Sequence, residues 1–485
     1  MTDTAEQMRP AASRRRRMLI LAICSMSVLI VSLDTTIVNV ALPAIHRSLH
    51  APLSGLQWTV DAYTLVIASL LMLAGSTGDR VGRKRIFSLG LVIFTLGSAL
   101  CAAAPSLGVL VGARALQAVG GSMLNPVAMS IIRNVFEDPR ERAQAIGVWA
   151  AMVGISLALG PVLGGGLVDT VGWRFVFLVN LPIGVAALAL TTLFVPESRA
   201  EHPRRIDPVG QLLVIVALAS LVYAIIEGQP RGWSSAEILS LFGVSLLAFI
   251  ALIAHELRRE EPLLEVRFFR SAPFSGASAI AVCAFASLGG YLFLNTLYLQ
   301  EVRHLSPFHA GLYTLPIAAM ALVLAPLSGR IVGRRGPRWP LLGAGLGLGV
   351  SPLLLTGLAP DTPIGLLLSS YVLFGIGFGL VNPPVTNTAL SGMPAAQAGV
   401  AAAVASTSRQ VGQTLGIAVM GAVAGAGAGR AFGPGFAAAT HPVWWIIATL
   451  GLAIFVIGLL TTSDWARSTA RTIAAQPAAD AAGAR

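Results

Sequence analysis

Four ionisable residues lie inside long apolar stretches of the chain: Asp34, Asp61, Arg114 and Arg409. A charge in hydrocarbon is costly, so such residues are expected to act on protons, ions or substrates. Two carboxylates that share a low-dielectric site with one guanidinium protonate at different pH values, so one of them can load and release a proton near neutral pH. We therefore predict proton coupling at Asp34 and Asp61, modulated by Arg114.

The positions of these residues along the expected helices give their depths. Asp34 lies roughly 24 Å from the inner end of its helix, whereas Asp61 and Arg114 lie roughly 8 and 10 Å from the outer end of theirs. All three are thus expected in the outer third of one bundle, both carboxylates beside Arg114. Arg409 lies roughly 18 Å deep, near the midplane, and with Gln410 it is expected to face a cavity.

Structural roles for these charges remain open on sequence alone. Asp34 could polarise a broken helix end near Pro43, and Asp61 could cap the start of its helix. Arg114 could hold Asp34 in a fixed ion pair that never titrates, and Arg409 could be a counter-charge to an acid in the other bundle.

The composition excludes an ordinary soluble protein. Of the 485 residues, 55% are hydrophobic and 11% are charged, whereas soluble domains carry about 25% charged residues. The net charge of +11 comes from basic residues that interrupt apolar runs rather than line one polar face, so we do not expect nucleic acid as a partner. Cys24, Cys101 and Cys283 have neither disulfide nor metal-ligand spacing, and we expect no metal or cofactor.

Fourteen stretches are long and apolar enough to cross a lipid bilayer. They lie near residues 18–41, 56–76, 86–104, 107–130, 143–166, 174–195, 209–227, 237–256, 272–299, 309–329, 339–358, 363–386, 397–424 and 443–463. If the N-terminus is cytoplasmic, 26 of the 33 basic residues fall on the cytoplasmic side and five on the other. This imbalance predicts an all-α membrane protein with both termini in the cytoplasm.

An internal repeat divides these spans into two sets. Residues Gly120 to Pro126 match Gly377 to Pro383, and Gly82-Arg83-Lys84 matches Gly333-Arg334-Arg335 at nearly the same offset. Two six-helix bundles related by an axis along the membrane normal form the major facilitator architecture, in which the substrate site lies between them. The expected units are a cytoplasmic tail (1–17), a six-helix bundle (18–198), two inserted helices (199–262), a second six-helix bundle (263–463) and a disordered tail (464–485).

Several motifs resemble the fourteen-helix drug:proton antiporters of the major facilitator superfamily. The first-helix signature resembles Leu33 to Pro43, and the loop motif between helices 2 and 3 resembles Gly75 to Arg85. Arg114 with Gln117 and Gly120 is similar to the fourth-helix motif, whose Arg the family links to proton transfer. Further matches are the antiporter motif of helix 5 (Gly147, Gly160, Pro161, Gly164, Gly165), the sixth-helix opening with Asn180, and Arg409-Gln410 in helix 13.

The resemblance implies a role for each set of residues. A substrate cavity is expected at Asn39, Tyr63, Gln117, Arg409 and Gln410. A cytoplasmic gate that locks the two bundles together by charge is expected at Gly75, Asp79, Arg80, Gly82 and Arg83. The helix 5 motif is associated with exchange rather than uptake.

Together these features predict a proton-coupled exporter of amphipathic drugs or antibiotics, not an enzyme, that acts as a monomer in a bacterial cytoplasmic membrane. Its partners are small amphipathic substrates, protons and the lipid bilayer. The main alternative is an exporter of one endogenous metabolite, and a channel or receptor is a further one. An ATP-driven pump is excluded because the single lysine, Lys84, lies outside any phosphate-binding loop motif. Further acids in spans 10 and 13, which some exporters of lipophilic cations carry, are absent here.

Overall fold

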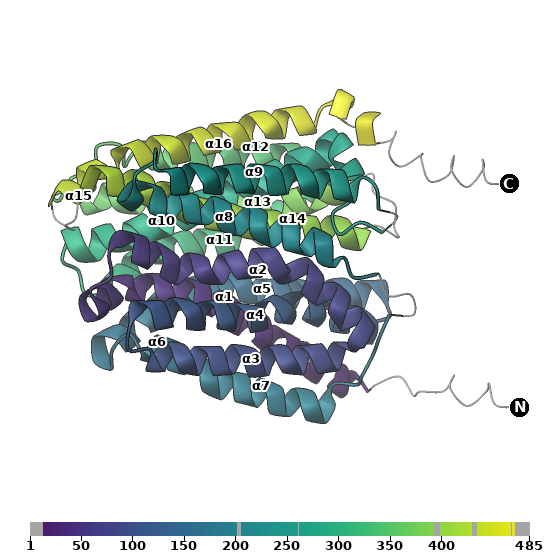
Figure 1. The fold of residues 1–485 in the computed structure, drawn as a ribbon. Coiled ribbons are helices and arrows are strands. Elements are labelled where there is room, and N and C mark those ends of the chain that lie inside the picture. Colours follow the sequence, from purple (N-terminus) through teal and green to yellow (C-terminus); the bar gives the residue numbers. More distant parts are fainter. Residues whose placement is uncertain are drawn as a thin grey trace, which may run out of the picture.

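The computed structural model describes residues 13–200, 205–259, 261–391, 398–428, 434–466 and 468–470. Within these ranges the regular structure is helical, and the long helices run roughly alongside one another (Figure 1). The N-terminal half consists of α1 (Arg14–Leu49), α2 (Leu53–Val81), α3 (Arg83–Ala103), α4 (Leu107–Val135), α5 (Pro139–Thr170), the short α6 (Phe175–Leu178) and α7 (Asn180–Phe194).

The chain continues through an inserted pair, α8 (Pro208–Arg231) and α9 (Ala236–Glu256), and a 3-10 turn (Val266–Arg270). The C-terminal half consists of α10 (Ala272–Leu297) with a π-helical turn (Tyr298–Val302), α11 (Pro307–Arg335), α12 (Arg338–Leu353), α13 (Ile364–Leu390), α14 (Ala398–Ala428), the short α15 (Pro434–Ala439) and α16 (His441–Thr461).

The predicted repeat is visible in how the helices pack. In the N-terminal half α1 packs on α5, α3 on α4 and α2 on α4; in the C-terminal half α10 packs on α14, α12 on α13 and α11 on α13. The repeated glycines serve the same purpose in each half. A Cβ at Gly120 would overlap the α3 backbone at Phe94, and one at Gly377 would overlap the α12 backbone at Leu348. Small residues let these helices approach closely.

The two halves meet along two matching contacts, α5 with α11 and α2 with α14. We call the end of the bundle where α1 begins and α16 ends the N–C end, and the opposite end the far end (Figure 1). Within the described ranges, the hydrogen bonds between the halves lie between the middle of the bundle and the far end, as does the one from Gln300 to the carbonyl of Val40.

The inserted pair lies against the second of these contacts. Helix α8 packs on both α2 and α14, whereas α9 packs on α8. The Gln211 amide donates to the carbonyl of Ser69, and the Trp58 indole donates to Glu227, so polar contacts fix α8 to α2 near both of its ends. Helix α9 exposes Leu246, Leu247 and Ile250, as expected of a lipid-facing helix.

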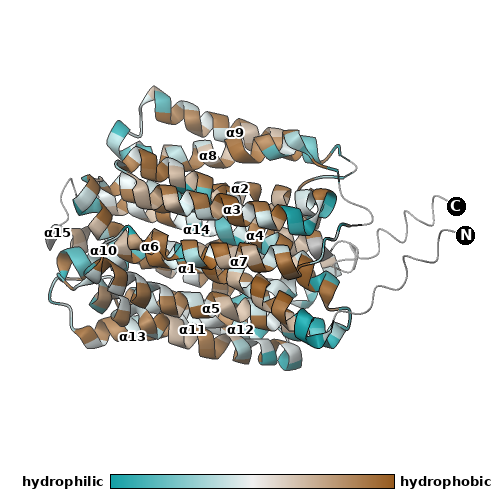
Figure 2. Ribbon diagram, turned by 90° about the horizontal axis from the view of Figure 1, so that it is seen from below, coloured by the Kyte–Doolittle hydropathy of each residue, from teal (hydrophilic) through white to brown (hydrophobic). Residues whose placement is uncertain are grey.

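Polarity along the helices fits a bilayer. Hydrophilic residues gather at the two ends of the bundle and apolar residues fill the middle (Figure 2). Within the described ranges, twelve helices are long and apolar enough to cross a membrane. The predicted spans 339–358 and 397–424 correspond to α12, which has 16 residues, and to α14, and neither is among those twelve.

The chain ends differ in detail from the expected tails. Arg14 to Arg17, placed in the N-terminal tail, form the first turn of α1, which the Ser13 hydroxyl caps. In the expected disordered tail, residues 464–466 and 468–470 are helical, and the Thr469 hydroxyl accepts the backbone N–H of Ala272. This N–H is unpaired within the first turn of α10, which explains why the chain is held there. Residues 1–12 and 471–485 lie outside the described ranges.

Candidate functional site

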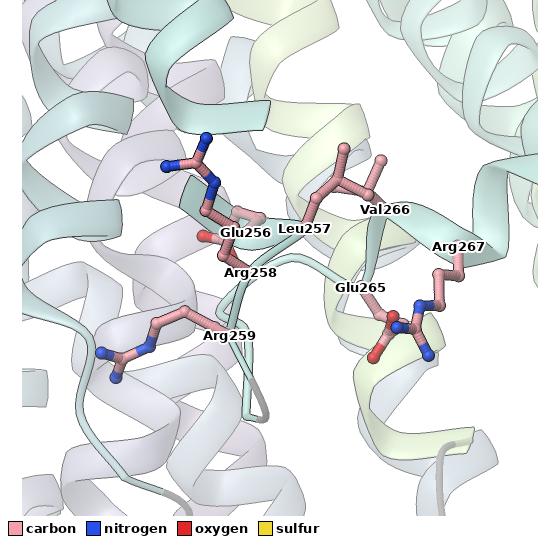
Figure 3. A pocket seen from close by; sticks show the side chains of 7 residues that line it. All are labelled: Glu256, Leu257, Arg258, Arg259, Glu265, Val266 and Arg267. Atoms are coloured by element: carbon pink, nitrogen blue, oxygen red, sulfur yellow. The ribbon is translucent and has the colours of Figure 1, made fainter. Parts of the chain in front are cut away.

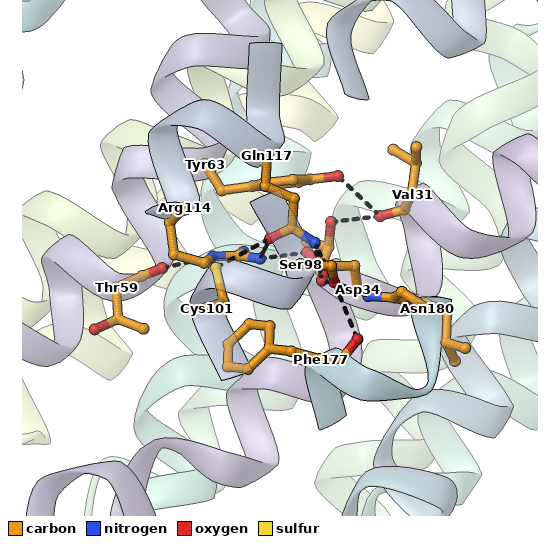
Figure 4. A network of polar contacts seen from close by, with 12 residues as sticks. Val31, Asp34, Thr59, Tyr63, Ser98, Cys101, Arg114, Gln117, Phe177 and Asn180 are labelled. Carbon is orange, nitrogen blue, oxygen red and sulfur yellow. Dashed lines mark hydrogen bonds and ion pairs between the residues drawn. The ribbon is translucent and has the colours of Figure 1, made fainter. Parts of the chain in front are cut away.

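The Asp34 carboxylate is the centre of a closed polar network in the N-terminal half (Figure 4). It forms an ion pair with Arg114 of α4 and accepts hydrogen bonds from the amides of Gln117 (2.8 Å) and Asn180 (3.0 Å). The side chains of all four residues are fully buried. The network therefore holds a charge pair inside the helix bundle with most of its polar atoms matched, as burial of charge requires.

The surroundings of Arg114 explain how the guanidinium tolerates this position. Its Nε donates to the carbonyl of Thr59 (3.1 Å) and its Nη1 to Gln117 (2.8 Å). The Tyr63 ring lies 4.2 Å from the guanidinium carbon, so a cation–π contact adds to the ion pair. Ser98 links the Gln117 and Asn180 amides to the carbonyl of Phe177.

Two of the predicted cavity residues lie in this network instead. Tyr63 and Gln117 are fully buried against Arg114 and are not among the residues that line the small cavity at Asn39. Helical depth predicted their level in the membrane, but it could not predict that both side chains turn toward Asp34. The predicted ion pair between Asp34 and Arg114 is present.

Asp61 lies apart from this network, which corrects the expectation that both carboxylates sit beside Arg114. Its hydrogen-bond partner is the Thr64 hydroxyl (3.3 Å), and Oδ2 is buried without a partner. Asp61 also does not cap its helix, because α2 begins eight residues earlier at Leu53. A helix-end role for Asp34 is likewise wrong, because α1 continues unbroken through Pro43 to Leu49.

Asp61 lies on the face of α2 that packs against α14. Gln57, four residues before it, donates to the carbonyl of Ala418 (2.8 Å), and Thr64, three residues after it, accepts from the Thr414 hydroxyl (2.9 Å). Residues three or four apart share one helix face. We call this contact the α2–α14 seam. The Thr64 hydroxyl, which contacts both Asp61 and Thr414, links Asp61 to the other half.

Asn39 lies in the wall of a small cavity between the halves, and its place in a substrate cavity stays a prediction. The cavity measures about 10 Å³, and its walls are Thr36, Asn39, Val40, Pro161, Leu292, Thr296, Ala310 and Thr314. Such a volume holds roughly one water. Its walls belong to α1, α5, α10 and α11, so it lies where the two halves meet.

Arg409 and Gln410 lie half-buried in α14. The Arg409 Nη2 donates to the Thr386 hydroxyl of α13 (2.7 Å), while its Nε is buried without a partner. Within the described ranges, no carboxylate lies within ion-pair distance of it. The counter-charge role for Arg409 therefore has no support here.

The predicted gate residues form contacts inside the N-terminal half. Asp79 pairs with Arg83 (2.9 Å), and its carbonyl accepts the N–H of Ala200 from the segment after α7. Gly82 has φ +133°, a backbone conformation that favours glycine. Arg80 is exposed, Gly75 packs near Pro126, and the described residues make no link from this motif to the other half.

The helix 5 glycines divide into two groups. A Cβ at Gly160 or Gly164 would overlap α1 at Thr36 or Ile37, and one at Gly165 would overlap the start of α11 at Pro307. Gly147 has open space around it. Close approach of helices therefore explains the far-end part of the motif, next to Pro161, and not Gly147.

A larger pocket of about 400 Å³ lies away from this site, at the N–C end. It is lined by Glu256, Leu257, Arg258, Arg259, Glu265, Val266 and Arg267 (Figure 3). Charges of both signs alternate along its wall, and the labelled arginines point in different directions rather than toward one point. We therefore place the functional site at the membrane-depth charges.

Comparison with known proteins identifies the family. The profile of the Major Facilitator Superfamily matches residues 24–417. The chain belongs to the major facilitator superfamily. Among curated superfamily members, it is 39% identical to the multidrug resistance protein Stp of Mycobacterium tuberculosis, over 84% of this chain and 76% of that protein. It is 37% identical to the tetracenomycin C resistance and export protein of Streptomyces glaucescens, over 86% and 78% of the two chains.

Solved structures of this superfamily share the fold. A bacterial homologue of the human lysosomal transporter Spinster, inward-facing and occupied, aligns with a TM-score of 0.63 at 19% identity, over 96% of this chain and 98% of that chain. A bacterial homologue of the human drug peptide transporters aligns with a TM-score of 0.65 at 16% identity, over 94% and 99% of the chains. The major facilitator fold and a multi-pass location in the cytoplasmic membrane follow.

Sequence reasoning missed part of the site. Asn180 was recognised as part of a motif but not as a ligand of Asp34, and Ser98 and Thr59 were not singled out. An Asn at membrane depth was the available signal, because an unpaired amide in hydrocarbon is costly. The Thr59 carbonyl is a backbone group, so residue types could not predict its contact with Arg114.

Proposed function

We propose that this protein is a proton-coupled secondary active exporter of amphipathic drugs or antibiotics that works by alternating access. The observation that carries the proposal is the fully buried Asp34–Arg114 ion pair, ligated by Gln117 and Asn180. A buried acid whose charged form depends on specific partners is suited to exchange a proton for a conformational change. Relatives named as resistance and export proteins support the direction and the class of substrate.

We propose that the chain crosses the membrane fourteen times, with both termini and the N–C end in the cytoplasm. The excess of basic residues on that side supports this orientation. On this reading α1 to α7 and α10 to α16 are the two transport bundles, α8 and α9 are an addition to them, and the working unit is a monomer without a cofactor.

With the N–C end placed in the cytoplasm, we propose that this conformation faces the cytoplasm. Hydrogen bonds join the halves between the middle of the bundle and the far end. They lie at the α2–α14 seam and where Asp169 accepts the N–H of Phe308. The gate motif around Asp79 makes its contacts within its own half, so we propose that it links the halves only when the protein faces outward.

Asp61 connects protonation to the seam. A carboxylate with one hydroxyl partner and no cation is costly to bury between two bundles. The seam therefore closes more readily when Asp61 carries a proton. A proton that binds Asp61 from outside would thus favour closure of the far end. Asp34, paired with Arg114, would be the group that releases a proton to the cytoplasm.

The test measures drug-driven proton release from inside-out membrane vesicles. For Asp34→Asn we expect loss of proton release and of drug accumulation, because the carboxylate no longer titrates. Collapsing the pH difference and the membrane potential together should abolish export by the wild type. Export that survives this treatment would contradict the proposal.

Controls separate loss of coupling from misfolding. Removing one partner of a buried pair destabilises by about 3 to 5 kcal/mol, so the double variant Asp34→Asn/Arg114→Gln is measured in parallel. It restores a neutral, hydrogen-bonded pair and should reach the membrane at wild-type level, yet remain uncoupled. Glu237→Gln, an exposed site in α9, is the matched carboxylate control and should transport normally.

A further inference from the structure

Arg409 is a cation without a counter-ion in the C-terminal half. Among the described residues its hydrogen-bond partner is one neutral hydroxyl, that of Thr386, and Nε has none. The helices α10 to α14 and α16 contain no Asp or Glu at all. The acids of this half, such as Glu301 in the π-helical turn, lie outside these helices, and none of those in the described ranges forms an ion pair with Arg409.

The other half supplies no partner either. The Asp34 carboxylate is occupied by Arg114, Gln117 and Asn180. Asp61 is bonded to Thr64, inside the closed seam. Arg114 differs from Arg409 in this respect, since its charge is matched by Asp34. Of the membrane-depth charges described here, Arg409 is thus the cation left for a ligand.

Arg409 also lies where a ligand could reach it from the N–C end. It precedes Thr414, which closes the seam against Thr64, by five residues, or roughly 8 Å along the helix. The residue as a whole is partly exposed, although its Nε is buried. It therefore lies on the N–C side of the Thr64–Thr414 hydrogen bond, next to the Thr386 hydroxyl.

A pair of aromatic side chains packs farther along the helices that flank it. Phe285 of α10 and Phe378 of α13 meet edge to face with ring centroids 5.3 Å apart. Arg409 and Thr386 would meet the charged end of an amphipathic molecule. The aromatic rings on the neighbouring helices would meet its apolar body.

We propose that Arg409 binds the negatively charged group of the substrate, so that the preferred cargo is an amphipathic anion bearing a carboxylate or phenolate. The inference rests on the proposed export function and specifies its substrate class. A guanidinium forms paired, charge-assisted hydrogen bonds to a carboxylate, which a neutral or cationic compound cannot form. Thr386 positions the guanidinium, and Gln410 offers a further amide donor.

Three fluorescent probes with one aromatic body test the proposal: 1-pyrenebutyrate (anion), 1-pyrenebutanol (neutral) and 4-(1-pyrenyl)butyltrimethylammonium (cation). Proton-driven uptake into inside-out vesicles is measured for each, and kcat/KM values are compared. We expect the wild type to prefer pyrenebutyrate over the cation by on the order of tenfold or more, because a hydrogen bond to a charged group is involved.

Variants at Arg409 assign this preference to one side chain. Arg409→Gln should lower kcat/KM for pyrenebutyrate about tenfold to a hundredfold and leave pyrenebutanol nearly unchanged. Arg409→Lys keeps the charge and should retain part of the activity toward pyrenebutyrate. This retained activity would show that the protein folds with a substitution at this position. Arg409→Glu should shift the preference toward the cation.

The outcomes distinguish the two proposals. Proton-driven export of the cation or the neutral probe in preference to pyrenebutyrate, unaffected by Arg409→Gln, would overturn the anion assignment and leave the exporter function intact. Equal losses for all three probes in Arg409→Gln with a folded protein would make Arg409 a structural residue and also overturn it. Absence of proton-driven uptake of every probe by the wild type would count against the proposed function itself.

Discussion

The Asp34 carboxylate is held by three side chains from two different helices, and each has a distinct effect. Arg114 supplies the opposite charge, while Gln117 and Asn180 supply amide hydrogen bonds to the same oxygen. Such a site is stable only while every member is present, because a half-satisfied buried network costs more than an apolar one. We therefore expect protonation of Asp34 to change the contacts among α1, α4 and α7.

The sequence predicted the depth of these residues better than their direction. Asp34 and Arg114 were expected to meet, and they do, because their depths and opposite charges agree. Asp61 was expected beside them, yet it faces α14. A two-residue difference from Tyr63 turns a side chain by about 200° around a helix, and single-sequence reasoning could not tell which of these faces meets Arg114.

A pH-dependent contribution to stability is expected outside the membrane, at Asp207. Burial alone would raise the pKa of this N-cap carboxyl, but the Gly210 amide, the His255 ring and Arg259 outweigh it, so the pKa lies below its ordinary value. A lowered folded-state pKa stabilises the protein above the unfolded value of about 3.9, and this stabilisation is lost as pH falls through the folded value.

The corresponding variant is Asp207→Asn. We expect it to lower the free energy of unfolding by about 1 to 3 kcal/mol at pH 7 and the gap to the wild type to shrink below about pH 4. Thermal unfolding in detergent across pH 3 to 8 measures this. His255→Gln is the companion variant that separates the imidazole from the carboxylate. A gap that widens in acid would refute the assignment.

At the scale of helices, spacing of small residues decides which pairs can pack closely. The repeat predicted from Gly120 and Gly377 is confirmed by matching contacts of α3 with α4 and α12 with α13. What the sequence could not provide was the division of span 174–195 into α6 and α7, or the short α12. Hydropathy reports the length of an apolar run, but not where a helix within that run ends or is interrupted.

Two glycines of α5 provide a matched test of close packing. Gly160→Ala places a methyl group on Thr36, so α1 and α5 must separate, and we expect a loss of about 1 to 3 kcal/mol in stability. Gly147→Ala meets open space and should not lower stability. Thermal midpoints in detergent compare the two. Equal destabilisation by both would show that backbone freedom, rather than contact with α1, accounts for the motif.

At the scale of the whole molecule, the position of α8 determines how the halves can move. Its polar contacts go to α2, through Gln211 and Trp58, whereas it meets α14 through an apolar cluster with Leu415 and Ala418. Apolar surfaces slide past one another without breaking specific bonds. The inserted pair should therefore travel with the N-terminal half and cover the α2–α14 seam from the lipid.

Spin labels at the far end can follow this motion. With labels at Ser54 in α2, Gln229 in α8 and Ala426 in α14, we expect the distance from 54 to 426 to lengthen at alkaline pH, as Asp61 loses its proton and the seam opens. The distance from 54 to 229 should stay constant. Asp61→Asn, which mimics the protonated acid, should keep the seam closed at every pH. Opening of the Asn variant with the wild-type pH profile would exclude Asp61 as the trigger.

The lone positive charge at Arg409 has a consequence for the energy source of transport. One-for-one exchange of an entering proton for a departing monoanion carries two positive charge equivalents inward. Each is worth about 2.3 kcal/mol per 100 mV of membrane potential. Such an exchange would continue in an alkaline medium, where the pH difference across the membrane vanishes but the voltage remains. A cell using this protein could then keep clearing acidic compounds under conditions that stall the electroneutral exchange of cations.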